Sequence, residues 1–481
     1  HNGKMYRVTI LRGTAPVVTL NSYASEVAAY TGGRGRLSLE LAGYGECHNA
    51  EKIIEEFAYS PEADLENTPD SVFCAHGSGF VVPWNEVYDY MHVESAFNAF
   101  SKNNILYGET KPHNAQSKKK CFAIDLGYNL EESIPAIVKY AFIENDKQII
   151  SQIEKVVNQN LNFILPDGGI DNSFGNRNNK WTYWGSRTSD GIHAGFLHFA
   201  DKDIRYAEAS LRNVEQLNAC TINGILYGGP RYYKHHEYGC THHLVEHINS
   251  LAYCIEHFSP KLLERKYFGN ISLPLDSDFF EYLEEVRTLR VKKGKYFATI
   301  TDYDYDTQGS GHASGLTLTC LFKEKNIPMV MGSVTDYKLV EPTNMQVALD
   351  RDSHRSLLPR LELIKNNKRY TSTYYDNASF IYTNNKGQTH IRGTTGLENE
   401  QKEIIKKNIN IEYIISKKGV EIHIYNLQNE NFIVPLINGN AEILSGKLTA
   451  TKEIFFLTGG FMAKEHTIQP NKKGEINILL F

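Results

Sequence analysis

Residues 171–191 read DNSFGNRNNKWTYWGSRTSDG, and the interpretation of the whole chain starts from this stretch. It shows neither a helical nor a strand period, and Gly175, Gly185 and Gly191 mark it as a loop. Aromatic rings stack on the C–H faces of sugars, amides bind hydroxyls, and arginine binds a carboxylate in a fork. We therefore expect a carbohydrate site, although a structural loop with buried tryptophans is the alternative. The candidate residues are Asn172, Asn176, Arg177, Trp181, Trp184, Arg187 and Asp190.

Composition and charge limit the classes of function. The chain has 481 residues, enough for about two to four domains of roughly 150 residues each. A net charge of −5 does not favour nucleic-acid binding, and no stretch has the ~20 apolar residues of a membrane span. The seven scattered cysteines contain no CxxC pair, which argues against a disulfide scaffold or a zinc ribbon. We expect no metal and no other cofactor. The chain begins at His1 without a signal peptide. We therefore expect its N-terminus to be a fragment, a processed end or a boundary, and localisation does not follow.

Residues 1–95 form the first of four expected segments. Strand-like alternation over 6–11 and 37–42 flanks a helical pattern over 22–31, which predicts half of a ferredoxin-like module. The blocks YASEVAAYTGGRGRLSLELAGYGECHNAEKIIEEFAY and ADLENTPDSVFCAHGSGFVVPW closely resemble the C-terminal end of the tetracycline-resistance ribosomal protection GTPases, which are relatives of elongation factor G. The resemblance implies the end of domain V and contact with the ribosome. No GxxxxGK[ST] loop is present, so GTP hydrolysis is not expected.

Residues 96–121 and 122–270 are expected to be a linker and a helical domain. The first range has no period and ends in three lysines, which predicts an exposed linker. Hairpins of helices predict an α/α toroid in the second range, incomplete because five helices do not close a ring of six hairpins. The predicted helices cover residues 130–142, 147–164, 191–200, 205–220 and 244–258.

A second chemical cluster, YGGPRYYKHHEYGCTHHLVEH, covers residues 227–247. Histidine titrates near neutral pH, and a basic neighbour can lower the pKa of a tyrosine. Tyr232, Tyr233, His235 and His236 are therefore candidates for acid and base. Purely structural histidines are one alternative. A metal pair is another, because two histidines of the final helix are spaced i, i+4, although no HExxH motif occurs. Substrate contacts are expected from Arg231, His242 and His243.

Residues 271–481 are expected to form an antiparallel β-sandwich behind a short helix at 279–286. The predicted strands cover residues 295–306, 313–322, 327–337, 369–376, 379–384, 411–428 and 476–481. The glycine-rich loop DYDYDTQGSGHASG, residues 302–315, contains Tyr303 and His312. Because such loops often carry function, we expect Tyr303 to bind substrate and His312 to act in catalysis. The alternative is that the tyrosine belongs to a strand and the histidine is incidental. The expected fold class is thus multidomain α+β.

An Asn/Arg/Trp loop, a Tyr/His loop and a His-bearing loop follow each other in this order. The arrangement over 122–481 resembles the toroid-plus-β-sandwich polysaccharide lyases, such as heparinase II/III-like and alginate lyases. The resemblance implies β-elimination from an acidic, uronate-containing polysaccharide or oligosaccharide. That chemistry needs a neutralised carboxylate, a base for the C5 proton and an acid for the leaving O4. The implied roles are Asn176 or Asn172 with Arg177 as neutraliser, Tyr232 or Tyr233 as acid, His235, His236 or His312 as base, and Trp181 and Trp184 as sugar platforms.

Other functions stay open at this point. A glycoside hydrolase would use a pair of carboxylates, for which Asp171 with Asp190, or Asp302 with Asp304, are candidates. A non-catalytic carbohydrate-binding scaffold is the third possibility. Residues 1–95 could form a ribosome-contacting module, with ribosomal RNA as partner. The different compositions of the two parts also allow a chimeric chain of two unrelated pieces.

Overall fold

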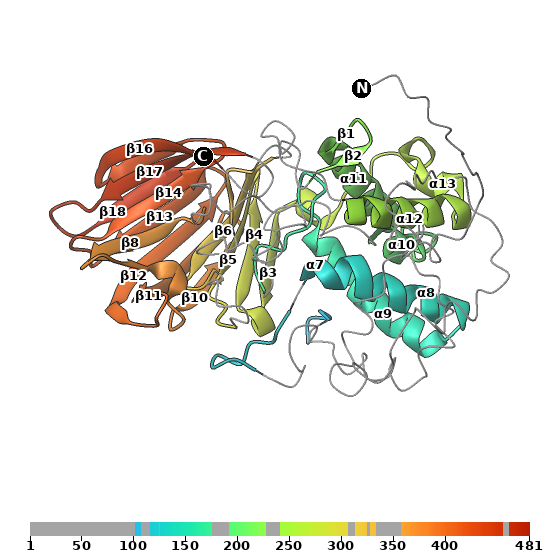
Figure 1. Cartoon of the computed structure of the whole chain (residues 1–481), viewed down its shortest axis with the longest axis horizontal. Coiled ribbons are helices and arrows are strands. Elements are labelled where there is room, and N and C mark those ends of the chain that lie inside the picture. Colours follow the sequence, from blue (N-terminus) through green and yellow to red (C-terminus); the bar gives the residue numbers. More distant parts are fainter. Residues whose placement is uncertain are drawn as a thin grey trace, which may run out of the picture. The chain divides into compact units, whose positions relative to one another are not determined.

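The computed structural model describes the backbone of residues 102–106, 116–124, 126–175, 192–227, 241–305, 313–324, 328–332, 357–455 and 461–481. By its contacts the chain divides into two units, His1–Leu65 and Glu66–Phe481, and all described residues belong to the second. They form a helical part followed by two antiparallel sheets, so the fold is multidomain α+β (Figure 1). The predicted ferredoxin-like half-module lies outside the described residues.

The helical part consists of short helices that pack as neighbours. Helix α8 contacts α9 and α10, and α10 in turn contacts α11 and α12. Asp146 caps α9 by accepting hydrogen bonds from the backbone N–H groups of Gln148 and Ile149. The described helices are α7 (Leu126–Tyr128), a π-helical turn (Asn129–Ser133), α8 (Ile134–Ile143), α9 (Lys147–Asn160), α10 (Ile192–Leu197), α11 (Arg205–Cys220), α12 (Thr241–His257) and α13 (Pro260–Leu263). The helix predicted at 205–220 is confirmed at both ends.

The smaller sheet has five antiparallel strands in the order β3-β4-β5-β6-β7. Every residue of β4 and β5 is buried, so the polar side chains that alternate with Leu289 and Val291 in β4 are buried as well. The strands are β3 (Phe279–Leu283), β4 (Thr288–Lys293), β5 (Tyr296–Thr301), β6 (Thr317–Lys323) and β7 (Val330–Met331).

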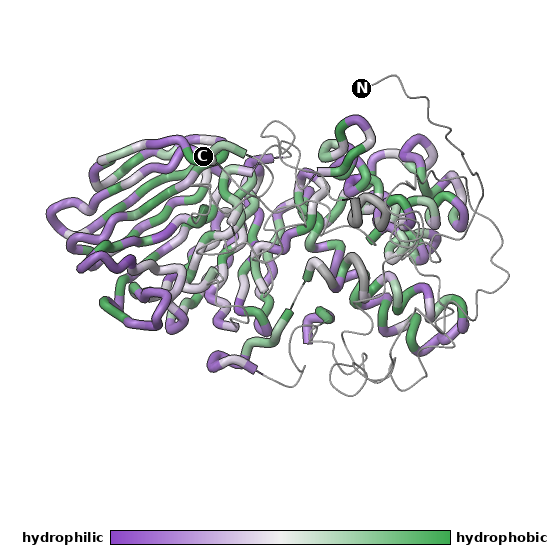
Figure 2. Tube along the Cα trace, in the orientation of Figure 1, coloured by the Kyte–Doolittle hydropathy of each residue, from purple (hydrophilic) through white to green (hydrophobic). Residues whose placement is uncertain are grey.

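The larger sheet is antiparallel in the order β15-β18-β13-β12-β11-β9-β8-β14-β17-β16, with β10 paired to β11. Figure 2 shows apolar and polar residues alternating along these strands. The apolar face shares one hydrophobic core with the smaller sheet. The strands are β8 (Arg360–Lys365), β9 (Lys368–Thr371), β10 (Ser379–Asn384), β11 (Gln388–Glu398), β12 (Ile404–Ser416), β13 (Gly419–Tyr425), β14 (Asn431–Leu436), β15 (Ala441–Ser445), β16 (Lys447–Phe455), β17 (Met462–Gln469) and β18 (Ile476–Leu480).

Several predicted elements differ from the structure. The strand expected at 369–376 ends at Thr371 and is followed by a 3-10 turn, Ser372–Tyr374. The helix expected at 279–286 is wrong, because its aromatic first half forms strand β3 and only Glu284–Val286 makes a 3-10 turn. The single strand expected at 411–428 is two strands. The chain reverses after Ser416, which pairs with Gly419 across a two-residue turn.

The described residues of the expected linker are held against the second half of the chain. Ile105 and Leu106 are buried in the helical core. The backbone N–H of Asn103 donates to the Glu285 carboxylate at 3.1 Å, and the N–H of Phe122 donates to the Glu285 carbonyl at 3.1 Å. These residues therefore form part of the folded domain, in contrast to the exposed linker that their sequence predicts.

Candidate functional site

Most of the predicted site residues lie outside the described part of the chain. For His242 and His243 the structure gives only the backbone, in the first turn of α12. Asn172 and Tyr303 are described with their side chains. Three predicted loops cover residues 176–191, 228–240 and 306–312, and the structure describes the residues on both sides of each. We call these flanking residues the loop roots. The residues outside the description are Asn176, Arg177, Trp181, Trp184, Arg187, Asp190, Arg231, Tyr232, Tyr233, His235, His236 and His312.

The first root begins at Asp171, whose side chain is fully buried. One carboxylate oxygen accepts hydrogen bonds from the backbone N–H and the hydroxyl of Ser173, at 3.3 and 2.7 Å. The other accepts from the Thr299 hydroxyl at 2.7 Å and from Nε of Arg290 at 3.0 Å. Four hydrogen bonds therefore fix the carboxylate that opens the Asn/Arg/Trp loop, which lies next to the buried Asn172.

Arg290 connects this root to the sheet. Its Nη1 donates to Glu281 of β3 at 3.1 Å, and its side chain is fully buried. The guanidinium carbon lies 4.8 and 5.3 Å from the ring centroids of Phe163 and Phe297. Aromatic rings and two carboxylates thus compensate a cation that has no contact with water.

The other end of the first loop enters α10 at His193, which sequence reasoning missed. The side chain is 1% exposed and lies beside Asn213 of α11 and His247 of α12. Burial, together with the neighbouring His247, lowers the pKa of His193 to about 3, so the imidazole is neutral at ordinary pH. Asn213 also donates to the carbonyl of Gly168 at 3.1 Å. The contacts of His193 link α10 to the helix that follows the Tyr/His loop.

The second root leaves α11 through a two-residue hairpin turn. Strand β1 (Thr221–Ile222) pairs with β2 (Ile225–Leu226) across Asn223 and Gly224, both with positive φ. The backbone N–H of Tyr227 then donates to the Cys220 carbonyl at 3.0 Å. This hairpin fixes the point at which the Tyr/His segment begins.

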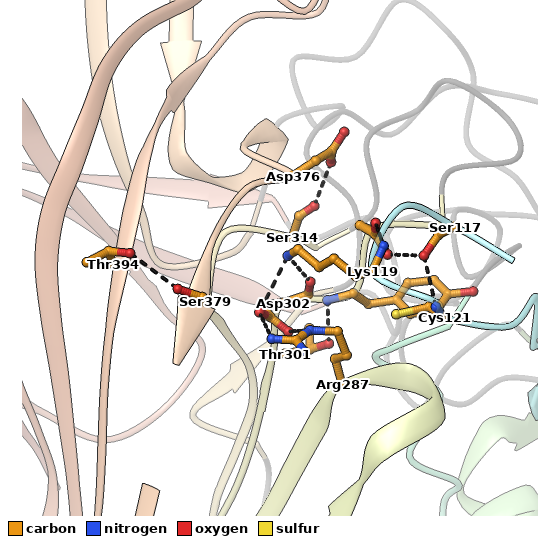
Figure 3. A network of polar contacts seen from close by, with 12 residues as sticks. Ser117, Lys119, Cys121, Arg287, Thr301, Asp302, Ser314, Asp376, Ser379 and Thr394 are labelled. Carbon is orange, nitrogen blue, oxygen red and sulfur yellow. Dashed lines mark hydrogen bonds and ion pairs between the residues drawn. The ribbon is translucent and has the colours of Figure 1, made fainter. Parts of the chain in front are cut away.

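The third root follows β5 and is held by a polar network (Figure 3). Arg287 donates two hydrogen bonds, at 2.8 and 2.7 Å, to the two oxygens of the buried Asp302 carboxylate. Nζ of Lys119 donates to the Asp302 carbonyl at 2.7 Å, and burial lowers the pKa of this lysine. Asp304 accepts from the Ser117 hydroxyl and from the backbone N–H of Lys119. The predicted linker therefore supplies two of the partners of this root, Ser117 and Lys119, in addition to Arg287.

Tyr303 points into the helical core, and its hydroxyl donates to the Phe122 carbonyl at 2.7 Å. Burial raises the pKa of Tyr303 well above its ordinary value. Beyond the loop, the Ser314 hydroxyl donates to Asp376 at 3.1 Å. Gly315 has φ +73°, and a Cβ atom there would lie 1.8 Å from the Ser372 carbonyl oxygen, so glycine alone fits. Both ends of the His312 loop are thus anchored, while the predicted substrate contact of Tyr303 stays a prediction.

The first and third roots lie against each other. The hydroxyls of Ser173 and Thr319 are 2.9 Å apart, and Thr319 lies in β6, which follows the third loop. A Cβ atom at Gly175 would lie 2.5 Å from the Ile124 carbonyl oxygen, two residues after the acceptor of Tyr303. These distances join the first and third roots, and His193, at the far end of the first loop, lies beside His247 of the helix that follows the second loop.

The carboxylates proposed for a hydrolase pair have other partners. Asp171, Asp302 and Asp304 each accept several fixed hydrogen bonds, and the first two also form ion pairs. A hydrolytic pair needs carboxylates that can exchange a proton with substrate and water. The described aspartates therefore fit an anchoring function better than acid–base catalysis.

Within the described ranges, no three His, Cys, Asp or Glu side chains gather as a metal site, and no helix there is both long and apolar enough to cross a membrane. The four described cysteines are buried free thiols, and burial raises the pKa of Cys121 to about 12.

Two family models and one relative that match this chain all belong to the ulvan lyases. Residues 89–268 match the ulvan lyase N-terminal domain, so this match takes in the predicted linker, and residues 280–475 match the ulvan lyase C-terminal domain. A broad-specificity ulvan lyase from Formosa agariphila is 31% identical over 357 residues. The alignment covers 71% of this chain and 55% of that protein, so the chain spans about half the length of this relative.

A solved structure, the 4-alpha-glucanotransferase from Thermococcus litoralis, is 11% identical with a TM-score of 0.26. The overlap covers 61% of this chain and 47% of that one, and a score this low supports no conclusion.

Residues 89–268 and 280–475 match, in this order, the two domains of the ulvan lyases. Together with the Formosa agariphila relative, these matches show that this chain is related to the polysaccharide lyases of that group.

Proposed function

We propose that this protein is a polysaccharide lyase that cleaves an acidic, uronate-containing polysaccharide by β-elimination. The observation that carries the proposal is the ordered match of both ulvan lyase domains. The name of the Formosa agariphila relative makes ulvan the first substrate to test. The contact between the first and third roots, and that of His193 with His247 of α12, support a common site for the three groups that the reaction needs.

The proposed chemistry assigns one task to each loop. Asn176 or Asn172, with Arg177, would neutralise the uronate carboxylate and so make the C5 proton removable. Tyr232 or Tyr233 would give a proton to the leaving O4. The base would be His235, His236 or His312. Sugar binding would come from Trp181, Trp184, Arg187, Asp190, Arg231, His242 and His243. Tyr303, buried in the helical core with its hydroxyl on the Phe122 carbonyl, fits packing better than sugar binding.

The finer description of the fold belongs to the same proposal. Packing of α8 on α9 and of α10 on α11 supports a partial α/α toroid. The core shared by the two sheets supports a β-sandwich. The resemblance of residues 1–95 to a translation-factor fragment, and with it a ribosome-contacting function, stays a prediction, because the ulvan lyase matches begin only at residue 89.

The test is the ultraviolet absorbance of the conjugated double bond that elimination leaves on the product. The full chain is incubated with ulvan, with other uronate polysaccharides and with a neutral glucan. We expect absorbance to rise with ulvan and not with the glucan. New reducing ends without absorbance would show hydrolysis, and binding without either signal would show a non-catalytic scaffold.

Single substitutions then test the tyrosine assignment. Tyr232→Phe or Tyr233→Phe should abolish turnover while the unfolding midpoint stays unchanged, because phenylalanine keeps the ring and removes only the proton donor. Full activity in both variants would contradict a tyrosine acid at either position.

A further inference from the structure

Four aromatic rings line the junction between the two sheets. Phe280 and Tyr282 come from the edge strand β3, while Phe380 and Tyr382 come from β10, the strand outside the main path of the larger sheet. Ring centroids are 5.4 Å apart for Phe280 and Tyr382, and 5.9 Å for Tyr282 and Phe380. Tyr382 is 38% exposed and the other three rings are partly buried. The four rings, called the aromatic ladder below, therefore offer an apolar strip that reaches solvent.

One end of the aromatic ladder lies at the third loop root. The Arg287 guanidinium carbon is 5.9 Å from the ring centroid of Phe380, and the same guanidinium holds the Asp302 carboxylate. The ladder is therefore continuous with the region where the proposed lyase site is anchored.

The other end of the ladder reaches three turns that lie together. Nζ of Lys293, at the end of β4, donates to the carbonyl of Asn385 in the turn after β10, at 2.9 Å. A Cβ atom at Gly294 would lie 3.1 Å from Cγ of Lys417, in the turn between β12 and β13. Phe280 pairs with Val291, shortly before the turn after β4, and Tyr382 lies shortly before the turn after β10.

The three turns present unpaired positive charge. Four exposed lysines occupy them, and none forms an ion pair with any residue that the structure describes: Lys295, Lys386, Lys417 and Lys418. The nearby acids are Asp278, whose carboxylate accepts the Gly294 N–H at 2.7 Å, and Glu324, whose backbone N–H donates to the Lys295 carbonyl. Positive charge exceeds negative charge at this end of the sheets.

We propose that the aromatic ladder and the four lysines form an accessory binding surface for an acidic polysaccharide chain. Rings provide flat faces for sugar C–H groups, and ammonium groups pair with carboxylate or sulfate. The six residues of β10 extend over ~20 Å, so the surface fits a polymer of several sugars and not a single sugar. Ring packing between the sheets explains the buried parts of the rings, but it does not explain four lysines without acids on three separate turns.

The surface extends the proposed function, because it would hold the same polymer beside the loops that cleave it. Lys472 and Lys473 provide a matched control. They are also two exposed lysines in a two-strand turn, but this turn joins β17 to β18 near the opposite end of β13. Replacing either pair by glutamine removes the same charge from the full chain.

The experiment measures the affinity of each full-chain variant for ulvan, with dextran as the neutral polymer. Lys417→Gln/Lys418→Gln should weaken ulvan binding about five-fold and reduce its salt dependence, whereas Lys472→Gln/Lys473→Gln should leave both unchanged. Tyr382→Ala should weaken binding about ten-fold. Equal midpoints of unfolding would show that the variants are folded.

Two outcomes would overturn the surface: no loss of ulvan affinity in either lysine variant, or an equal loss in both. These outcomes are distinguishable from failure of the proposed function. If the variants lose binding as expected but the parent chain eliminates no polysaccharide, the surface stands and the lyase proposal fails. If elimination is normal and the Lys417 and Lys418 substitutions have no effect on binding, only the surface fails.

Discussion

The most informative perturbation is Arg290→Met, because methionine keeps much of the length and removes the charge. Asp171 would keep three of its hydrogen bonds, from Thr299 and Ser173, but would lose its buried counter-ion. Glu281 would keep the side-chain amides of Gln159 and Asn162, at 2.7 and 2.8 Å. Arg290→Met thus leaves the buried Asp171 carboxylate without a counter-ion. Glu281 also loses its counter-ion but is less deeply buried and keeps two amide donors.

The size of the effect follows from that burial. Removing one partner of a buried ion pair costs about 3–5 kcal/mol. The remaining hydrogen bonds of Asp171 place Arg290→Met near ~3 kcal/mol, a large part of the ~5–15 kcal/mol by which domains are usually stable. The matched control is Arg392→Met. This side chain is 65% exposed and pairs with Glu412 at 2.7 Å, so we expect a loss of at most ~1 kcal/mol.

Equilibrium unfolding in urea measures both variants, followed by circular dichroism and by tryptophan fluorescence so that separate domain transitions are visible. The double variant Asp171→Asn/Arg290→Met should lose less than the sum of its single variants, because neither charge is then left alone. A loss for Arg290→Met no larger than that for Arg392→Met would refute the reasoning.

Three further predictions concern the roots and the first loop. The pKa of His193 is about 3 in the folded chain and near 6.5 when unfolded, so only the unfolded chain gains a proton between these values. Stability should fall by up to ~1.4 kcal/mol per pH unit as pH drops below about 6.5, and His193→Gln should reduce this slope in unfolding curves. Gly315→Ala should destabilise more than Gly224→Ala, because both glycines have positive φ but only the first would clash with Ser372, and thermal unfolding compares them. Trp184→Ala should weaken oligosaccharide binding by ~1–2 kcal/mol in calorimetry, and unchanged affinity would mean that the ring only packs in the core.

Local patterns predicted the elements whose apolar side chains repeat regularly. The helix at 205–220 and the strand at 379–384 have the predicted bounds, since each has its own period and flanking turn residues. The segment 279–286 failed because a short run of aromatic residues fits a helix and a strand equally well. The hydrogen bonds between β3 and β4 stabilise the strand, and the sequence of 279–286 alone does not reveal this partner.

The candidate site also has parts that the local sequence predicts and parts that depend on distant contacts. Its loops could be recognised from residue type alone, because amides, tryptophans, tyrosines and histidines gather there. Their anchors could not, since Arg290 reads as an ordinary strand residue and Lys119 as part of a solvated linker. Each acquires its function from a partner far along the chain: Arg290 lies 119 positions from Asp171, and the contacts of Lys119 span 183 and 185 positions.

The docking of residues 102–106 and 116–121 onto the second half of the chain has a consequence for the order of folding. Asn103 meets Glu285 across 182 positions of the chain, and Ser117 meets Asp304 across 187. At a synthesis rate of about 5–20 residues per second, the early segment leaves the ribosome roughly 10–40 s before its partners exist. During that interval Leu283, Val286 and Tyr303, which complete the core that contains Ile105 and Leu106, are missing as well. The first domain can therefore be completed only after the first strands of the second domain have been made.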